Sequence, residues 1–190
     1  MGDPKHPKKK YQTPKHPWQK ARIDEEKILV KEYGLKNKRE IWKMKTLLRN
    51  FTRQAKRVVT KTTPQFEKEK LQLLTRLQHL GLLSENTQVN DVLSLHLKNI
   101  LDRRLQTFVY KKNLARSVKQ ARQFIVHEHI MVNNQKITSP GFLVPKMHEG
   151  TISFSSVSSL ASPDHPEREI LERKPKKRKV KMVRPMRRRR

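Results

Sequence analysis

The sequence has no cysteine among its 190 residues. This absence excludes disulfide bonds, thiolate nucleophiles and cysteine-based zinc sites together. A metal ion would have to rely on the eight histidines, which are scattered along the chain. Only His127 and His129 lie close together, and residues two apart on a helix do not share a face. We therefore expect no metal site and no other cofactor.

Long apolar runs are also missing, since none approaches the roughly 20 residues that a membrane-spanning helix needs. The first ten residues, MGDPKHPKKK, lack the apolar segment of a secretory signal. The two absences together predict a soluble, intracellular protein without a membrane partner.

Aromatic residues (6%) and glycines (five) are scarce. With so few aromatic rings, base stacking on single strands is not expected to dominate any nucleic-acid binding. Five glycines leave no loop of the kind that cradles nucleotide phosphates, and no paired carboxylates mark a cleft-forming segment. The sequence therefore favours neither an enzyme nor a protein with a small-molecule substrate.

Acidic residues are few: 17 Asp and Glu stand against 45 Lys and Arg, which leaves a formal net charge of +28. A compact chain with this charge repels itself unless an anionic partner neutralises it. Nucleic acid is the first candidate, because each neutralised phosphate releases condensed counterions. A membrane surface ranks second, since no amphipathic helix with an aromatic anchor is evident, and acidic proteins rank third.

Residues 1–22 are expected to form an extended basic arm. The first 20 residues hold four prolines and six lysines and little to bury, so the arm should become ordered only on a partner. Trp18 could stack on a base, but anchoring the arm against its own domain is the favoured interpretation. A short helix should follow over residues 24–33, with Asp24 as N-cap and Gly34 as its left-handed C-terminal residue.

A second helix is indicated from residue 38, because Asn37 and Glu40 have capping-box spacing. Apolar residues then recur at steps of three and four and predict a buried stripe: Ile41, Met44, Leu48, Phe51, Ala55 and Val58. The flanks of this helix are dense in cations, which could simply be solvated. The global charge favours phosphate contact, and four of these cations are candidate binding residues: Arg49, Arg53, Lys56 and Arg57.

Two further helical stretches follow. The first starts at the Thr63-Pro64 pair, carries a stripe of leucines and ends at Gly81. The second is a helical pattern from Val92 to Val109, with an expected break near residues 96–99.

The stretch ARSVKQARQFIVHEHIMVN, residues 115–133, predicts a capped helix that runs into a strand. Asn113 suits the left-handed end of the preceding helix, and Ser117 with Gln120 forms a capping box. Asn133-Asn134 can form the left-handed turn of a hairpin, and GFLV and TISF supply further short strands. One face of the capped helix is apolar, whereas the opposite face carries Lys119, Arg122 and Gln123.

From Ser155 the chain changes to a Ser/Pro-rich linker, and residues 158–190 are expected to be a basic, disordered tail. Residues 173–190 hold twelve Lys or Arg and no acid. The run KPKKRKV in this tail is similar to a nuclear-import signal, although any basic ribonucleoprotein tail would contain such a run.

The order of helix, capped helix, strand, asparagine turn and strand resembles the S-four RNA-binding domain. The resemblance rests on four stretches in the family's order: RRLQT (103–107), LARSVKQARQFI (114–125), HEHIMVN (127–133) and ITSPGFLV (137–144). Outside that module, HPW (16–18) and EYGLKNKREIW (32–42) resemble archaeal members of the ribosomal protein S-four family. The similarity spans about residues 3–160.

Three positions depart from the family's pattern, because Asn113, Glu128 and Asn134 stand where relatives commonly have glycine. Asn tolerates left-handed geometry at little cost. We expect Glu128 to point away from phosphate or to pair with a neighbouring Lys or Arg.

The resemblance implies a mostly helical α+β fold with four parts. After the arm would come a helical ribosomal-protein domain over 23–100, an S-four RNA-binding domain of two helices and a small antiparallel sheet over 101–157, and the tail. It further implies a structural protein of the small ribosomal subunit, in the cytoplasm, that binds the 5′ domain of 16S rRNA and nucleates assembly of the subunit body. Its other partners would be ribosomal protein S-five, with which it would contribute to translational accuracy, further small-subunit proteins and nearby messenger RNA.

By matching positions, the resemblance implies RNA-facing residues in the module: Arg103, Arg116, Lys119, Gln120, Arg122, Gln123, His127 and Lys136. Their cations would contact phosphate, and the amides would donate to sugar or base edges. For His127, an RNA contact and a hydrogen bond within the domain are both open. Arg104 lies on the same side of its helix as Ile100 and Phe108, so a structural ion pair is at least as well supported as an RNA contact.

Two rival functions share these features. The same module is appended to pseudouridine synthases and some tRNA synthetases, but such enzymes need a separate catalytic domain that the other helices and tails do not supply. A DNA-binding helix-turn-helix is the second rival, because residues 103–125 form two predicted helices joined by a short turn. The following strands and the additional helices suit RNA better, so we expect an rRNA-binding protein that is not an enzyme.

Overall fold

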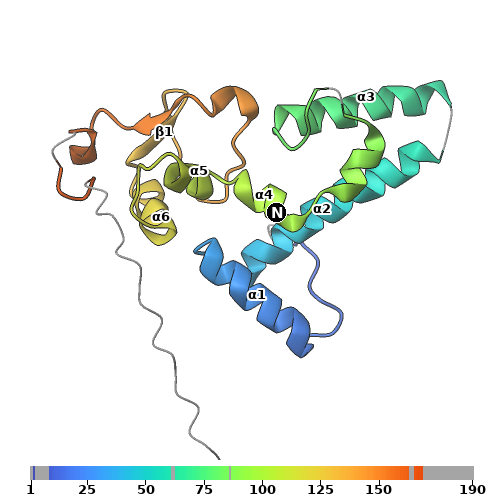
Figure 1. The fold of residues 1–190 in the computed structure, drawn as a ribbon, viewed down its shortest axis with the longest axis horizontal. Helices are drawn as coiled ribbons and strands as arrows, with labels where there is room; N and C mark the ends of the chain where they lie inside the picture. Colours follow the sequence, from blue (N-terminus) through green and yellow to red (C-terminus); the bar gives the residue numbers. More distant parts are fainter. Residues whose placement is uncertain (1, 3–8, 61–62, 86, 163–164, 169–190) are drawn as a thin grey trace, which may run out of the picture.

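A computed structural model describes residues 2, 9–60, 63–85, 87–162 and 165–168 of the chain. These residues form the mostly helical α+β fold that the sequence predicts. Figure 1 shows a helical lobe (residues 20–102) and a C-terminal module (residues 103–160). The predicted import signal and the tail beyond residue 168 lie outside the described residues. Within the described part of the chain, no helix is long and apolar enough to cross a bilayer.

The helical lobe is built on α2, Lys38–Val59. The Asn37 half of the predicted capping box is confirmed, because the Asn37 side chain accepts a hydrogen bond from the Glu40 backbone N–H at 3.3 Å; the Glu40 side chain accepts instead from the Lys36 backbone N–H at 3.3 Å. An N-cap of this kind contributes about 1 kcal/mol to helix stability. The predicted stripe faces inward, and its buried members are Ile41, Phe51, Ala55 and Val58. Phe51 and Ala55 pack against α3 (Pro64–His79) and the 3₁₀-helix η1 (Val89–Ser94), whereas Ile41 belongs to a separate buried cluster with Tyr33, Leu35 and Leu101.

The first helix, α1, spans Lys20–Glu32 and starts one turn earlier than the sequence predicts. Asp24 is therefore not the N-cap; it lies inside the helix, where its carboxylate pairs with Lys27 at 2.9 Å. The extra turn is held by Arg22, whose guanidinium donates to the backbone carbonyl of Pro17 at 2.7 Å. Gly34 does end this segment in the left-handed region, with φ +57°.

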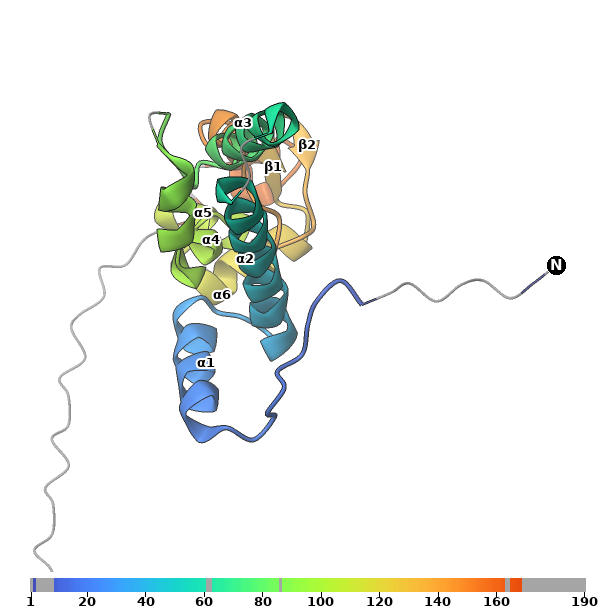
Figure 2. The ribbon, with the colours of Figure 1, turned by 90° about the vertical axis from the view of Figure 1, so that its right-hand side faces the viewer.

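Part of the arm packs on the helical lobe, although the sequence predicts that it orders only on a partner. The backbone N–H of Gln12 donates to Thr46 Oγ1 at 3.0 Å, and the Tyr11 ring lies 6.3 Å from the ring of Trp42. Figure 2 shows residues 9–19 running from the start of α1 back alongside α2. Side-chain contacts with α2 therefore order this segment before any partner binds.

The helical pattern predicted from Val92 to Val109 is broken twice. The expected break falls between η1 and α4 (Leu97–Asp102). A second break, which the sequence does not signal, separates α4 from α5 (Leu105–Lys111). There Arg104 is extended and bridges to Leu143, so the predicted strand GFLV pairs with this break instead of joining the sheet.

The C-terminal module packs α5 and α6 (Val118–Val126) against a small sheet. The strands are β1 (Ile130–Val132), β2 (Gln135–Lys136) and β3 (Ile152–Phe154), all antiparallel, in the order β2-β1-β3. The predicted Ser117 cap is present, since its hydroxyl accepts from the Gln120 backbone N–H at 3.2 Å. The Gln120 side chain accepts from the Arg116 backbone N–H at 2.8 Å rather than from Ser117 itself.

Backbone turns in the module follow the sequence. Asn113, Asn133 and Asn134 are left-handed, with φ of 58°, 49° and 62°, as expected for a helix end and a tight hairpin turn. The 3₁₀-helix η2 (Lys146–His148) leads toward β3, and η3 (Ser159–Ala161) follows it. Leu160 is buried in the module's core, so the packing continues past the predicted boundary at residue 157.

Candidate nucleic-acid interface

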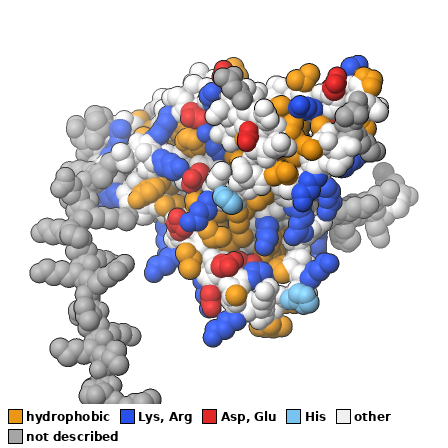
Figure 3. All heavy atoms as spheres, turned by 45° about the vertical axis from the view of Figure 1, so that its right-hand side comes forward, with side chains coloured by type: hydrophobic (Ala, Val, Ile, Leu, Met, Phe, Trp, Pro, Cys, Tyr) orange, Lys and Arg blue, Asp and Glu red, His pale blue; other side chains and the backbone are white. Residues whose placement is uncertain are grey.

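The outer side of α2 carries a groove of about 560 Å³. The spacing of residues in the sequence explains why cations line this groove. Every fourth residue from 45 to 57 is a cation, and residues four apart share one face of a helix. The groove, called the α2 groove below, is lined by Lys45, Leu48, Arg49, Thr52, Arg53, Lys56, Arg57 and Thr60. All four candidate residues predicted on this helix lie in it. Figure 3 shows Lys and Arg side chains gathered along this side of the molecule.

The charges of the α2 groove are uncompensated within the described chain. All five of its cations are exposed, and none forms an ion pair with a described carboxylate. Arg49 donates instead to the amide oxygen of Gln12, which leaves its charge unneutralised. A row of cations without an acidic partner fits a phosphate backbone, which offers negative charge and hydrogen-bond acceptors together.

A second polar surface lies on α6. Lys119, Gln123 and His127 are spaced by four residues, and all three side chains are exposed. We call them the α6 face. The His127 ring is parallel to that of His129, with 6.2 Å between centroids, and forms no hydrogen bond to another described residue. Of the two interpretations open for His127, an intradomain hydrogen bond therefore finds no support.

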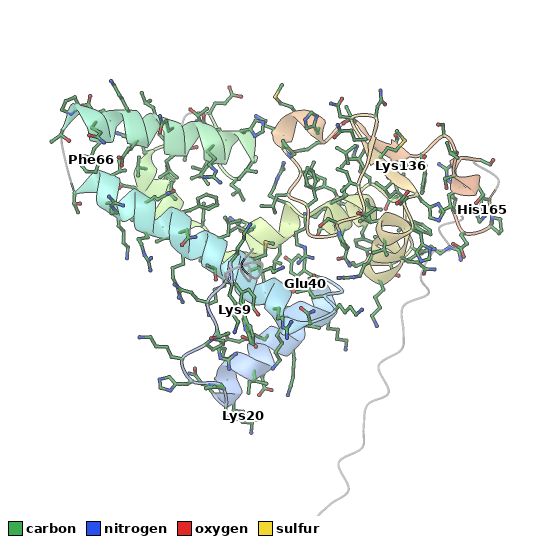
Figure 4. The ribbon with its side chains drawn as sticks, turned by 180° about the vertical axis from the view of Figure 1, so that it is seen from behind. Lys9, Lys20, Glu40, Phe66, Lys136 and His165 are labelled. Atoms are coloured by element: carbon green, nitrogen blue, oxygen red, sulfur yellow. The ribbon has the colours of Figure 1, made fainter. Side chains whose placement is uncertain are left out.

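Arg122 leaves the predicted face and turns toward the helical lobe. Its guanidinium donates to both carboxylate oxygens of Glu40, at 3.0 and 3.3 Å. The same carboxylate accepts from Arg104 at 2.5 Å, so the structural ion pair expected for Arg104 is present. Figure 4 shows Glu40 where α2 meets the module. Glu40, Arg104 and Arg122 together form an interlobe cluster.

The pKa of Glu40 is shifted by its burial and by the two guanidinium groups beside it. Burial by itself would raise the pKa of this carboxyl, but hydrogen bonds and charge from Arg122 and Arg104 outweigh it and hold the pKa below its ordinary value. Glu40 is therefore ionised at neutral pH. Arg104 is 1% exposed and its Nε and Nη1 lack hydrogen-bond partners in the described chain, so it depends on this carboxylate.

Arg103 is also held by the protein. Its guanidinium pairs with Glu149 at 2.5 Å, donates to the Val144 carbonyl at 2.8 Å and lies 4.8 Å from the centre of the Phe108 ring. With its side chain 12% exposed, it fixes the loop before β3 to the end of α4. An RNA contact through Arg103 stays a prediction, and the geometry gives it less room than the other candidates.

The remaining candidates lie at the edges of the module. Arg116 is half-buried and donates to the Pro166 carbonyl, and Gln120 serves the local cap. Lys136 is exposed on β2 and approaches Glu128 at 4.0 Å. This pairing confirms the expectation that Glu128 finds a basic neighbour, and its φ of 62° shows that it adopts left-handed geometry in place of glycine.

One feature of the interface was not predicted from the sequence. Glu40 was assigned only to a helix cap, because its partners lie 64 and 82 residues away and no local pattern marks them. Lys45 is one of the flank cations that the sequence places on this helix, and it lies in the α2 groove with the four candidate residues. Trp18 was expected to anchor the arm; its side chain is instead 89% exposed, and Tyr11 and Gln12 make the anchoring contacts.

Comparisons with known proteins agree with this architecture. The S4 domain family matches residues 103–149. The small ribosomal subunit protein uS4 of Methanococcus aeolicus is 53% identical over 169 residues, which cover 88% of this chain and 96% of the relative. The uS4 protein of Methanococcus maripaludis is 50% identical, covering 88% and 95%, and that of Picrophilus torridus 49%, covering 87% and 92%. The chain belongs to the uS4 family of ribosomal proteins.

Proposed function

We propose that this protein is a structural component of the small ribosomal subunit and a primary binder of the 5′ domain of 16S rRNA, without enzymatic activity. The observation that carries the proposal is the α2 groove, where five exposed cations stand without a described acidic partner. The names of the relatives and the S4 domain match support the same role.

The fold would recognise RNA by its shape. Folded RNA presents phosphates and 2′-hydroxyls at spacings set by its helices, and a protein reads that shape by holding cations and donors in fixed positions. Here the α2 groove supplies phosphate contacts and the α6 face adds an amide and an imidazole that can reach sugar or base edges. The interlobe cluster fixes one surface relative to the other through Glu40.

The finer parts of the proposed role rest on the resemblance of this chain to the uS4 family. Early binding to the 5′ domain would nucleate assembly of the subunit body, and the protein would act with ribosomal protein S-five in translational accuracy, close to messenger RNA. The protein would then work in the cytoplasm, within the small subunit. The support is the resemblance of residues 16–18 and 32–42 to archaeal uS4 sequences, together with the identity to archaeal relatives.

Binding measured as a function of salt tests the proposal. The full-length chain is titrated with a transcript of the 16S rRNA 5′ domain, with duplex DNA of equal length as competitor. If about ten phosphates are neutralised, log affinity falls with log salt at a slope of about −7 to −9. A complex insensitive to salt, or equal affinity for the DNA, would contradict the proposal.

A further inference from the structure

The side chain of Trp18 has no place in the protein's own packing. The chain has two tryptophans, and their environments are opposite. Trp42 packs beside a buried cluster of the helical lobe and donates its indole N–H to Glu26 at 3.1 Å. Trp18 is 89% exposed. A ring system that can bury roughly 150–250 Å² is thus left in water.

The backbone next to Trp18 is ordered despite this exposure, because the Arg22 side chain binds the turn that precedes it. Arg22 donates to the backbone carbonyls of His16, at 3.2 Å, and Pro17, at 2.7 Å. The same guanidinium pairs with buried Glu26 at 2.5 Å, and α1 begins two residues after Trp18. The structure therefore presents this ring on an ordered turn, at a fixed position outside the core.

The charges around Trp18 indicate which kind of ligand its ring can bind. Lys15 and Lys20 flank it and both are exposed, whereas the nearest carboxylate in sequence, Asp24, is paired with Lys27 at 2.9 Å. Figure 4 shows Lys20 at the corner of the molecule away from Lys136 and His165, so this site is separate from the module. An apolar protein partner would favour apolar neighbours around the ring. A nucleobase favours the arrangement present here, a flat aromatic face with cations beside it for the adjoining phosphates.

We propose that Trp18 stacks on an unpaired base of the rRNA, with Lys15 and Lys20 contacting the phosphates on either side. The inference rests on the proposed rRNA binding and adds a third contact, which is aromatic where the α2 groove and the α6 face are polar. Stacking tolerates any base, because every base has a π face, so this contact anchors the RNA without reading its sequence.

Substitutions that separate aromaticity from bulk test the inference in the full-length chain. Binding of the 16S rRNA 5′ domain transcript is measured for Trp18→Phe, Trp18→Leu and Trp18→Ala. Alanine and leucine should weaken binding by about 5- to 150-fold, the range for loss of one stacked base, while phenylalanine keeps most of the affinity. Ile28→Ala on α1, which removes another exposed apolar side chain, should leave the affinity unchanged.

Tryptophan fluorescence supplies a second readout in the same titration. Saturating RNA should quench the emission of the wild-type protein, and the quenching should disappear in Trp18→Leu. Wild-type affinity in Trp18→Leu with unchanged quenching would overturn the stacking contact alone and would point to a protein neighbour for this ring. Failure of the wild-type chain to bind the transcript would overturn the proposed function as well.

Discussion

Glu40 and Arg122 are 82 residues apart in sequence, yet two guanidinium nitrogens of Arg122 donate to the Glu40 carboxylate at 3.0 and 3.3 Å. The pair joins the start of α2 to the middle of α6. Since α2 carries the groove and α6 carries the second polar surface, this contact fixes the positions of the two surfaces relative to each other. A residue expected to bind RNA thus has a structural partner.

Replacing Glu40 with glutamine should destabilise the protein by about 3 kcal/mol. The change removes the charge that balances Arg104, and leaving one member of a buried pair uncompensated is costly. Urea denaturation followed by circular dichroism measures the effect. Glu32→Gln is the matched control, because Glu32 makes an exposed pair with Lys98 at 3.9 Å that should contribute less than about 1 kcal/mol. Equal effects of the two substitutions would contradict the structural role of Glu40.

The same cluster predicts a dependence on pH. Because the folded state lowers the pKa of Glu40 below its ordinary value, its ionisation stabilises the fold fully above that ordinary value, about 4.5. The contribution is then lost as the pH falls through the depressed pKa. The difference in unfolding free energy between wild type and Glu40→Gln should be constant near neutral pH and shrink below about pH 4.5. A difference that grows on acidification would contradict this assignment.

Local signals in the sequence were sufficient for most of the fold. The caps at Asn37 and Ser117, the left-handed residues at Gly34 and Asn113 and the hairpin at Asn133-Asn134 depend on neighbours within four residues, and all are confirmed. The break at Arg104 was missed because it depends on pairing with Leu143, and no Gly or Pro marks it. The early start of α1 was missed because it depends on the contacts of the Arg22 side chain.

The candidate interface likewise has features that local spacing predicts and features that depend on distant residues. Helical spacing brought Arg49, Arg53, Lys56 and Arg57 to one groove, as a stripe of exposed cations must. Spacing alone could not tell that Arg122 would find a carboxylate from another lobe, because a charge on the polar face of a helix is free to pair with distant residues. The sequence therefore predicts the charged faces, and tertiary contacts decide which charges remain available.

Replacing Glu128 with glycine should stabilise the protein by about 1 kcal/mol. This residue has φ 62°, a conformation that costs an ordinary side chain about 1–2 kcal/mol and glycine nothing. The exposed pair with Lys136 at 4.0 Å offsets little of this. Thermal unfolding of Glu128→Gly is compared with Glu128→Ala, which removes the same charge but keeps the strain. Equal melting temperatures for the two variants would rule out backbone strain as the cause.

Two substitutions on the α6 face should distinguish a charge contact with RNA from a hydrogen bond to RNA. Lys119→Ala should weaken rRNA binding and make the slope of log affinity against log salt shallower by about one, because one phosphate contact is lost. Gln123→Ala should weaken binding with the slope unchanged, because an amide displaces no counterion. Filter binding at several salt concentrations measures both. Lys111→Ala, which removes a cation of the same module that is paired with Asp102 of α4, should change neither quantity.

The α2 groove gives the most direct test of the proposed rRNA binding. The measurement is the affinity of Arg53→Ala/Arg57→Ala for the 16S rRNA 5′ domain across a salt series, beside Lys68→Ala/Lys70→Ala, which removes two exposed cations from α3. The groove variant should lose at least about tenfold in affinity and about 1.4–1.8 in salt slope, as expected for two lost phosphate contacts, while the α3 variant stays close to wild type. Equal losses in both variants would show that total charge rather than the groove binds the RNA, and no loss in the groove variant would contradict the account.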